Sequence, residues 1–421
     1  MLILLRQRKY RLILAANFVS LFGSGLNSAG TIWYVLQQTH SEASIALLVV
    51  LTTVPSLVFL PFTGLLIDRV DRRHLAIVLD VARCAGVGLV AWLAVTGSLQ
   101  LWQLYAMSML VGICTFVYWP NLSALIQELV QGRDIVALNA LLMGAAQGGW
   151  MIAGAVVGLI YGGYGIAGIL VLDAFTYAAS ATIYSRVRRG RDLSYRAQAH
   201  LDDGVASFAQ QIAAGLRYAA GHKPVLIIGA TSALFQAAMM SQNVVTAPLN
   251  DKILSSGAVG YGLCNAGWSL GAILASAAAG NRFRREGRAT QVLWLALGLT
   301  GISSVLLPFS GFLLVAVGLY FLMGGGRGVA GVAISTALMQ EVPRHVMGRT
   351  QNLFTFLGIV LQLAMTFGAG WLAEHVALAA GFFLIAGAYL AGSALSYTIR
   401  GHRGEFAEPE VAAILVAHED L

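Results

Sequence analysis

The stretch "GLLIDRVDRR", residues 64–73, contains five charged side chains: Asp68, Arg69, Asp71, Arg72 and Arg73. The chain around it is strongly apolar, because 58% of its 421 residues are hydrophobic and only 11% are charged. Basic residues between two apolar stretches are typical of a loop that ends a membrane crossing, and they set its orientation. Acidic residues contribute little to orientation, so Asp68 needs a separate explanation.

Apolar stretches that are long enough to cross a bilayer follow one another along the whole chain. The mean hydropathy is +0.75, whereas soluble domains contain only about half apolar residues. A crossing helix needs about 20 mostly apolar residues. The sequence therefore predicts an all-α membrane protein with twelve transmembrane helices. Their expected ranges are 11–37, 43–67, 75–97, 100–129, 136–162, 164–186, 223–250, 257–281, 289–309, 311–341, 346–374 and 376–400.

Basic residues gather in alternate loops. Arginines precede the first expected span and follow each even-numbered one, while the opposite loops contain a single basic residue, Lys252. This asymmetry places both termini in the cytoplasm, which requires an even number of spans. It also accounts for the net charge of +7, so we expect no nucleic-acid partner.

The motifs of several catalytic and cofactor-binding classes are missing from the sequence. Cys84, Cys114 and Cys264 all lie inside expected spans and form neither a disulfide framework nor a metal-binding spacing. No lysine follows the glycine runs as in a phosphate-binding loop. We therefore expect no metal, no cofactor and no enzymatic activity. Without an ATPase domain, energy for any transport must come from an ion gradient.

The two halves of the sequence match each other. "SALIQE", residues 123–128, resembles "TALMQE", residues 336–341, and the offset from Ser123 to Thr336 is 213 residues. Asn139 and Asn352 share that offset, and "AAAGNRFRRE" lies opposite the opening stretch. Parallel six-span repeats build transporters around a site near the bilayer midplane. We predict an N-terminal half at 1–186, a cytoplasmic linker at 187–222, a C-terminal half at 223–400 and a cytoplasmic tail at 401–421.

The linker contains a second pattern, that of an amphipathic helix. Asp202 or Asp203 would cap its start. Four apolar residues then fall on one face, as in a helix that lies at the membrane interface. They are Val205, Phe208, Ile212 and Leu216.

The opening stretch resembles the signature loop of the major facilitator superfamily, roughly G-x-L-x-D-R-x-x-R-R. Other stretches resemble its drug and siderophore exporter branch, which includes macrolide-efflux and enterobactin-exporter proteins. They are "DVAR" at 80–83, "LDAFTYAASA" at 172–181, "GYG" at 260–262 and "VPRHVMGRTQNL" at 342–353. The resemblance implies two pseudo-symmetric six-helix bundles. This chain departs from the pattern at Asn281, which occupies the second-half position of Asp68, and in its fifth span, which has no proline.

The resemblance also implies a role for the charged loop. In the superfamily the cytoplasmic end of span two lies beside the start of span eleven, where a helix N-terminus attracts an acid such as Asp68. Glu128 could accept a hydrogen-bonded arginine from the loop. We expect a conformational latch that closes when the two halves meet at the cytoplasmic face. Its residues would be Gly64, Asp68, Arg69, Arg72, Arg73 and Glu128, with Arg285 and Glu341 as the second-half counterpart.

Two ionisable residues lie deep inside expected spans, Asp173 and Arg327. Such residues mark ion pathways and binding sites. Asp173 either cycles a proton or is a structural side chain that bonds to neighbouring helices. Arg327 lies among glycines, which let a ligand approach, so it would meet an anionic substrate or a protein acceptor. Asp80 and Arg83 are spaced to pair within one helix, which favours a structural role.

Amide and aromatic side chains in the spans that line the cavity of this superfamily, and in their neighbours, form a set of candidate substrate contacts. Such groups suit a bulky amphipathic ligand, although single aromatics also serve in packing. The set contains no acid, which argues against a dedicated cation exporter. Its members are Asn17, Asn27, Trp33, Tyr34, Gln37, Tyr118, Trp119, Asn121, Gln147, Trp150, Gln236, Gln242, Asn243, Asn265, Trp268 and Gln362.

These patterns together predict a secondary transporter of a bacterial inner membrane. We expect it to export a bulky amphipathic small molecule, a drug or a siderophore, by alternating access and in exchange for protons. A nutrient importer and a lysophospholipid flippase are alternatives on the same fold. A membrane enzyme or sensor would need a catalytic cluster or an added soluble domain. The expected partners are the small molecule, protons and membrane lipids, and the expected state is a monomer.

Overall fold

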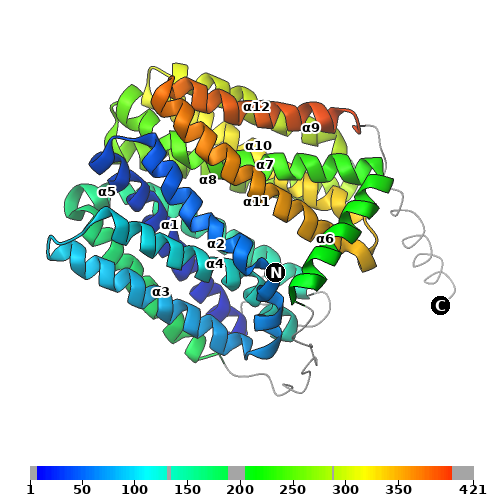
Figure 1. Ribbon diagram of the computed structural model, residues 1–421, viewed down its shortest axis with the longest axis horizontal. Helices are drawn as coiled ribbons and strands as arrows, with labels where there is room; N and C mark the ends of the chain where they lie inside the picture. The colour runs from blue at the N-terminus through cyan, green and yellow to red at the C-terminus, as the bar shows by residue number, and fades with distance from the viewer. Residues whose placement is uncertain (1–6, 130–133, 188–203, 287–288, 401–421) are drawn as a thin grey trace. The chain divides into compact units, whose positions relative to one another are not determined.

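The computed structural model describes residues 7–129, 134–187, 204–286 and 289–400, and every regular element in these ranges is a helix (Figure 1). The predicted all-α membrane fold is confirmed. The α-helices are α1 (Arg8–Thr39), α2 (Glu42–Arg69), α3 (Arg72–Val95), α4 (Leu101–Leu129), α5 (Asp134–Ser185), α6 (Gly204–Gly221), α7 (Lys223–Pro248), α8 (Gly257–Glu286), α9 (Ala289–Leu306), α10 (Leu313–Glu341), α11 (Arg344–His375) and α12 (Leu378–Tyr397).

One of these helices, α5, holds two membrane crossings. Its 52 residues would extend about 78 Å as a single helix, more than twice the roughly 30 Å of hydrocarbon in a bilayer. Gly165 breaks it with φ 60° and ψ −160°, a conformation that favours glycine. Among the described residues, eleven helices are long and apolar enough to cross a membrane. With α5 counted as two segments they give the twelve expected spans.

Contacts between residues group the chain into two compact units. The first contains Met1–Val205, Asn243–Ser269 and Gly311–Val317. The second contains Ala206–Gln242, Leu270–Ser310 and Gly318–Leu421. The helix α7 therefore belongs to the second unit up to Gln242 and to the first unit beyond it. The division of the chain into halves at the linker stays a prediction.

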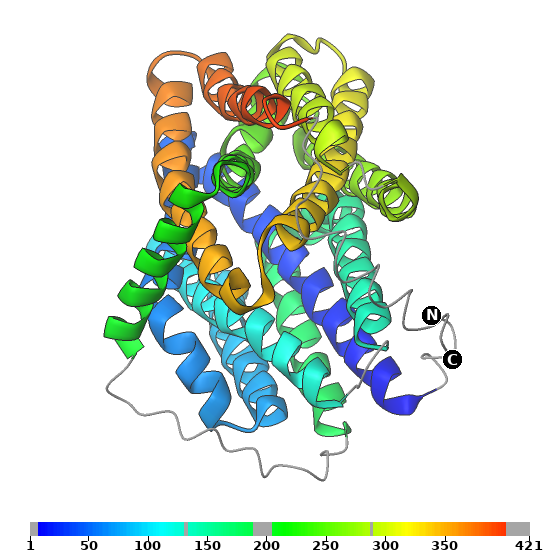
Figure 2. The same cartoon turned by 90° about the vertical axis from the view of Figure 1, so that its right-hand side faces the viewer.

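In the first unit, α1 lies against both segments of α5, and α3 lies against the second segment (Figure 2). Glycines let these helices approach. A Cβ on Gly149 of α5 would lie 3.0 Å from the backbone nitrogen of Phe22 in α1. A Cβ on Gly158 would lie 2.5 Å from the Cα of Val259 in α8. Close packing at small residues is what holds helices together in hydrocarbon, where the hydrophobic effect does not act between them.

In the second unit, α6 packs against the start of α11. A Cβ on Gly215 would lie 2.7 Å from the carbonyl oxygen of Arg349, and Ile212 joins a cluster with Ala219 and Leu353. Leu216 is 51% exposed. Ile212 is half-buried in this cluster, and the interfacial role of the helix stays a prediction. Asp202 and Asp203 lie outside the described residues, as do the side chains of Val205 and Phe208.

The contact of α5 with α8 predicts opposite outcomes for two glycines on the same helix. Gly158→Ala places a Cβ against the backbone of Val259, which cannot move aside, so the melting temperature of the purified protein should fall. Gly162→Ala places its Cβ where no atom lies within 4 Å, so the melting temperature should stay the same or rise. Equal melting temperatures for the two variants would contradict this packing.

Candidate functional site

A buried ion pair lies in the interior of the first unit. In α3, Nη2 of Arg83 lies 2.5 Å from Oδ1 of Asp80, with 1% and 0% of the side chains exposed. The predicted pairing is confirmed. From α5, Ser180 donates to the other oxygen of Asp80 at 2.6 Å. The guanidinium of Arg83 lies 4.6 Å and 5.0 Å from the ring centres of Tyr177 and Tyr118, within the range of cation–π attraction.

The two tyrosines extend this network to α1. The hydroxyl of Tyr118 lies 2.8 Å from that of Tyr184 and 3.4 Å from Oδ1 of Asn17. The hydroxyl of Tyr177 lies 2.9 Å from that of Ser24. Four spans thus converge on one charged pair. A buried polar network of this kind is stabilising only when its members have partners, and these side chains supply them to one another.

A second acid, Asp173 of α5, lies deeper in the same interior and is 0% exposed. Asn27 donates to its Oδ2 at 2.6 Å, and Thr176 donates to its Oδ1 at 3.2 Å. A Cβ on Gly23 would lie 2.3 Å from Oδ1, so only glycine lets α1 pass this close. The contacts fit the structural alternative, in which neighbouring helices satisfy the carboxylate. Proton coupling through Asp173 stays a proposal.

The charged loop contacts other helices of its own unit. Asp71 caps α3, because its Oδ1 accepts from the backbone N–H groups of Arg73 and His74 at 3.0 Å each. Arg72 donates to the carbonyl of Ala124 in α4 at 3.2 Å. Arg73 donates to the carbonyls of Tyr184, at 2.9 Å, and Ser185, both at the end of α5. The carbonyls of Tyr184 and Ser185 at the end of α5 lack partners within their own helix, so Arg73 stabilises that helix end.

The remaining latch residues are only partly described. The side chains of Asp68, Arg69, Glu128 and Arg285, and the packing of Gly64, lie outside the described part of the structure. Glu341 is 5% exposed at the end of α10, and its carbonyl accepts from Tyr218 at 3.4 Å. The latch therefore stays a prediction.

Many candidate substrate contacts of the first unit bond to protein. Asn17 donates to the carbonyl of Leu142, Asn27 binds Asp173, Asn121 donates to the carbonyl of Arg72, and Asn265 donates to that of Tyr261. Gln37 accepts from Tyr161 at 2.7 Å. Trp33 stacks on Tyr261 with ring centres 5.8 Å apart. Among the remaining candidates of both units, the half-buried ones are Tyr34, Trp119, Gln147, Gln236, Asn243 and Trp268. Trp150 is exposed, and Gln242 and Gln362 are buried.

Arg327 lies in the second unit, on α10. Its Nε donates to the sulfur of Met239 in α7 at 2.9 Å. In the same unit, the hydroxyl of Ser241 in α7 lies 2.9 Å from the hydroxyl of Thr366 in α11. Within the described ranges, no three His, Cys, Asp or Glu side chains come together in a way that could hold a metal ion.

A second ion pair was not predicted. Glu42, the first residue of α2, is 0% exposed, and its Oε1 lies 2.6 Å from Nζ of Lys252, which is 44% exposed. A π-helical turn, Leu249–Ile253, holds Lys252 at the end of α7. The available signal was that Lys252 is the one basic residue on its side of the expected topology. A lone cation there predicts an acidic neighbour, and Glu42 begins the second span.

Comparison with known sequences identifies the family. A sequence model of the Major Facilitator Superfamily matches residues 13–368. The chain belongs to this superfamily. Macrolide efflux protein A of Streptococcus pyogenes is 25% identical over 364 residues, which cover 86% of this chain and 87% of the relative. The resemblance to the drug-exporter branch of the Major Facilitator Superfamily is thereby supported.

Solved structures of the Major Facilitator Superfamily fold agree. The nucleoside transporter NupG superposes with a TM-score of 0.71 at 13% identity, covering 94% of this chain and 100% of that one. The peptide transporter POT in complex with sulfate superposes with a TM-score of 0.73 at 16% identity, covering 95% of both chains. Family membership makes this chain a multi-pass membrane transporter and not an enzyme.

The ion pair in α3 predicts a specific pattern of stability. Arg83→Met leaves Asp80 as an uncompensated buried charge, so the free energy of unfolding should fall by about 3–5 kcal/mol. The double variant Asp80→Asn/Arg83→Met carries no buried charge and should regain most of this loss. Arg186→Met, at an exposed arginine, is the control and should change little. Thermal unfolding of the purified proteins measures all of them, and a double variant as unstable as Arg83→Met alone would contradict the pairing.

Proposed function

We propose that this transporter exports a bulky amphipathic small molecule by alternating access, in exchange for protons. The observation that carries the proposal is its likeness, over 86% of the chain, to a relative named as a macrolide efflux protein. The arginine pattern supports an inner-membrane location with both termini in the cytoplasm. On this topology the ends of α2 and α7 that carry Glu42 and Lys252 belong to the outer face. The protein would act as a monomer.

The proposed cargo contacts exclude the side chains that form the buried network of the first unit. Asn17, Asn27 and Tyr118 take part in the buried network, so we leave them out. Half-buried Gln236 and Arg327 of the second unit stay in the proposal. The guanidinium of Arg327 would bind a carbonyl or an anionic group of the cargo, because arginine favours oxygen acceptors.

Proton exchange is proposed to use Asp173. The donors that bind its carboxylate, Asn27 and Thr176, are neutral. Buried acids inside spans are the groups from which membrane transporters build proton relays. Asp80 is less suited to this role, because it is bound in an ion pair with Arg83.

Alternating access requires the outer ends of the two sequence halves to separate once in each cycle. The Glu42–Lys252 pair joins a residue of the first half to a residue of the second. Oε2 of Glu42 is buried without a hydrogen-bond partner, so Lys252 is the group that offsets the burial of this carboxylate. We propose that the pair is an outer latch, which is intact while the outer face is closed and breaks as that face opens. The latch at the charged loop would act at the opposite face.

The export proposal is tested with a radiolabelled macrolide and inverted membrane vesicles. An acidic lumen should drive uptake into vesicles that contain the protein, and cells that express it should accumulate less drug. Asp173→Asn should abolish uptake that depends on the pH gradient, while Thr176→Val, which keeps the carboxylate, should retain it. Accumulation by cells and not by vesicles would establish import instead. Gradient-driven uptake by Asp173→Asn would remove Asp173 from the coupling mechanism.

The outer latch predicts a change in the reactivity of Cys264. This thiol is 0% exposed and lies in α8, 3.7 Å from Oδ1 of Asn250. In a Cys84→Ser/Cys114→Ser background, Glu42→Gln should increase the rate of maleimide labelling from outside about five- to 150-fold, as expected for a coupling of 1–3 kcal/mol.

The neighbouring exposed acid provides the matched control for this experiment, because Asp251→Asn leaves the pair intact and should not change labelling. Melting temperatures measured in parallel separate opening from unfolding. An unchanged labelling rate in Glu42→Gln would show that the pair does not hold the outer face closed.

A further inference from the structure

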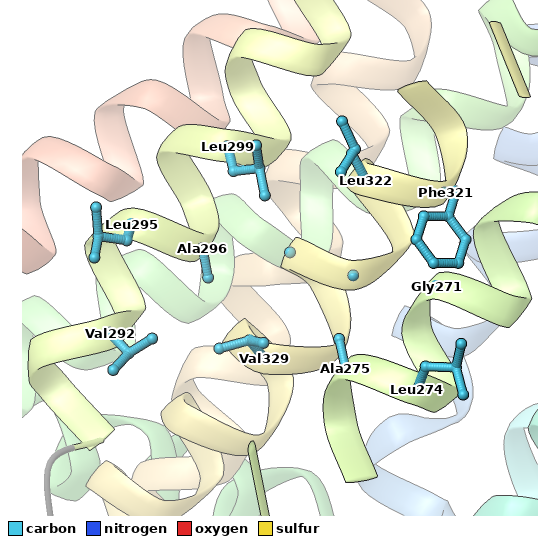
Figure 3. Close-up of a pocket in the computed structure, with 12 residues that line it drawn as sticks. Gly271, Leu274, Ala275, Val292, Leu295, Ala296, Leu299, Phe321, Leu322 and Val329 are labelled. Carbon is cyan, nitrogen blue, oxygen red and sulfur yellow. The ribbon is translucent and has the colours of Figure 1, made fainter. Parts of the chain in front are cut away.

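An apolar hollow lies among three helices of the second unit. It has a volume of about 510 Å³ and is lined by α8, α9 and α10. Figure 3 shows side chains from these helices surrounding a common space, with Leu295 and Leu299 on α9, Leu322 on α10 and Leu274 on α8. Every residue that lines it in the described part of the chain is Gly, Ala, Val, Leu or Phe. The volume is within the range of small-molecule sites, about 300–1,000 Å³.

The hollow exists because glycines set the helix spacing around it. A Cβ on Gly271 of α8 would lie 2.0 Å from the carbonyl oxygen of Phe321 in α10. A Cβ on Gly326 of α10 would lie 2.6 Å from the carbonyl oxygen of Ala296 in α9. The backbones therefore touch at these two points. Gly325 differs, because its Cβ would lie 3.7 Å from the Cβ of Ala275, an ordinary contact distance.

Two corresponding positions in the first half of the sequence are tightly packed. At the offset of 213 residues, Gly112 corresponds to Gly325 and Gly86 to Leu299. A Cβ on Gly112 would lie 2.1 Å from the carbonyl oxygen of Thr52, and one on Gly86 would lie 2.3 Å from a methyl carbon of Leu110. At these two positions the first half leaves no room for a larger side chain.

The rim of the hollow is exposed and apolar. Leu274, Leu295 and Leu299 are 55%, 52% and 43% exposed. They lie on helices that are long and apolar enough to cross the membrane. Exposed leucines on such helices contact hydrocarbon, so the hollow opens sideways to lipid. A molecule can therefore enter it without leaving the membrane.

The chemistry of the lining selects the occupant. Water is excluded, because a bound water needs two to four polar partners and this lining has no polar side chain. An amphipathic cargo is disfavoured, because its polar groups would lose their hydrogen bonds. An empty hollow would lose dispersion contacts along its whole wall. We propose that the hollow is a binding site for one acyl chain of a membrane phospholipid.

The site is tested on the purified full-length protein in nanodiscs that contain a phospholipid with a photoactivatable diazirine in mid-chain. After irradiation, peptide mapping should find label on α9 and α10 near Leu295, Leu299 and Leu322. Gly325→Leu fills the hollow and should lose this label. Gly331→Leu is the matched control on the same helix, because its Cβ has no atom within 4 Å and it does not line the hollow. It should keep the label.

Three outcomes would overturn the proposal. They are undiminished labelling in Gly325→Leu, equal labelling of α3 and α4 around Gly86, and displacement of the label by a macrolide but not by added phospholipid. The last would assign the hollow to the cargo. Melting temperatures confirm that the variants are folded. If Gly325→Leu does not fold, Ala275→Leu fills the same space from α8, and retained labelling in that variant overturns the proposal equally.

Discussion

The ion pair between Asp80 and Arg83 lies at the point where four of the first six spans meet. Charges inside hydrocarbon are costly unless they are paired and hydrogen-bonded. Ser180, Tyr177 and Tyr118 surround the pair and meet this requirement. Their contacts hold α3, α4 and α5 together around α1. The second half has Leu293 and Ala296 at the corresponding positions, so there its helices α8, α9 and α10 meet at glycines without a buried ion pair. One repeated architecture thus uses two kinds of contact.

Hydropathy was sufficient to predict the spans, including the division of α5, because Gly165 lies within two residues of the expected boundary. The direction in which a side chain points was harder to predict. Asn27 was placed among the substrate contacts, yet it binds Asp173, 146 residues later. Glu42 and Lys252 are 210 residues apart. A repeat and a hydropathy pattern locate a residue along its span, whereas its neighbours depend on how each helix is rotated and which distant helix it meets.

The residues of the charged loop carry a signal for membrane topology and also make contacts within the folded unit. Its arginines fit the positive-inside pattern, but Arg72 and Arg73 also donate to carbonyls of α4 and α5, and Asp71 caps α3. These contacts lie within one unit, so they are compatible with any movement of that unit as a rigid body.

The chain is synthesised from its N-terminus, so the members of the buried network enter the membrane at different times. An isolated Asp or Arg at the centre of an inserting helix costs about 2.5–3.5 kcal/mol. Asp80 and Arg83 lie one turn apart on α3, so this helix carries its own counter-charge into the translocon. Ser180 emerges about a hundred residues later, roughly 5–20 s at ordinary rates of translation. Asp173 also arrives late, when Asn27 is already in the bilayer to receive it.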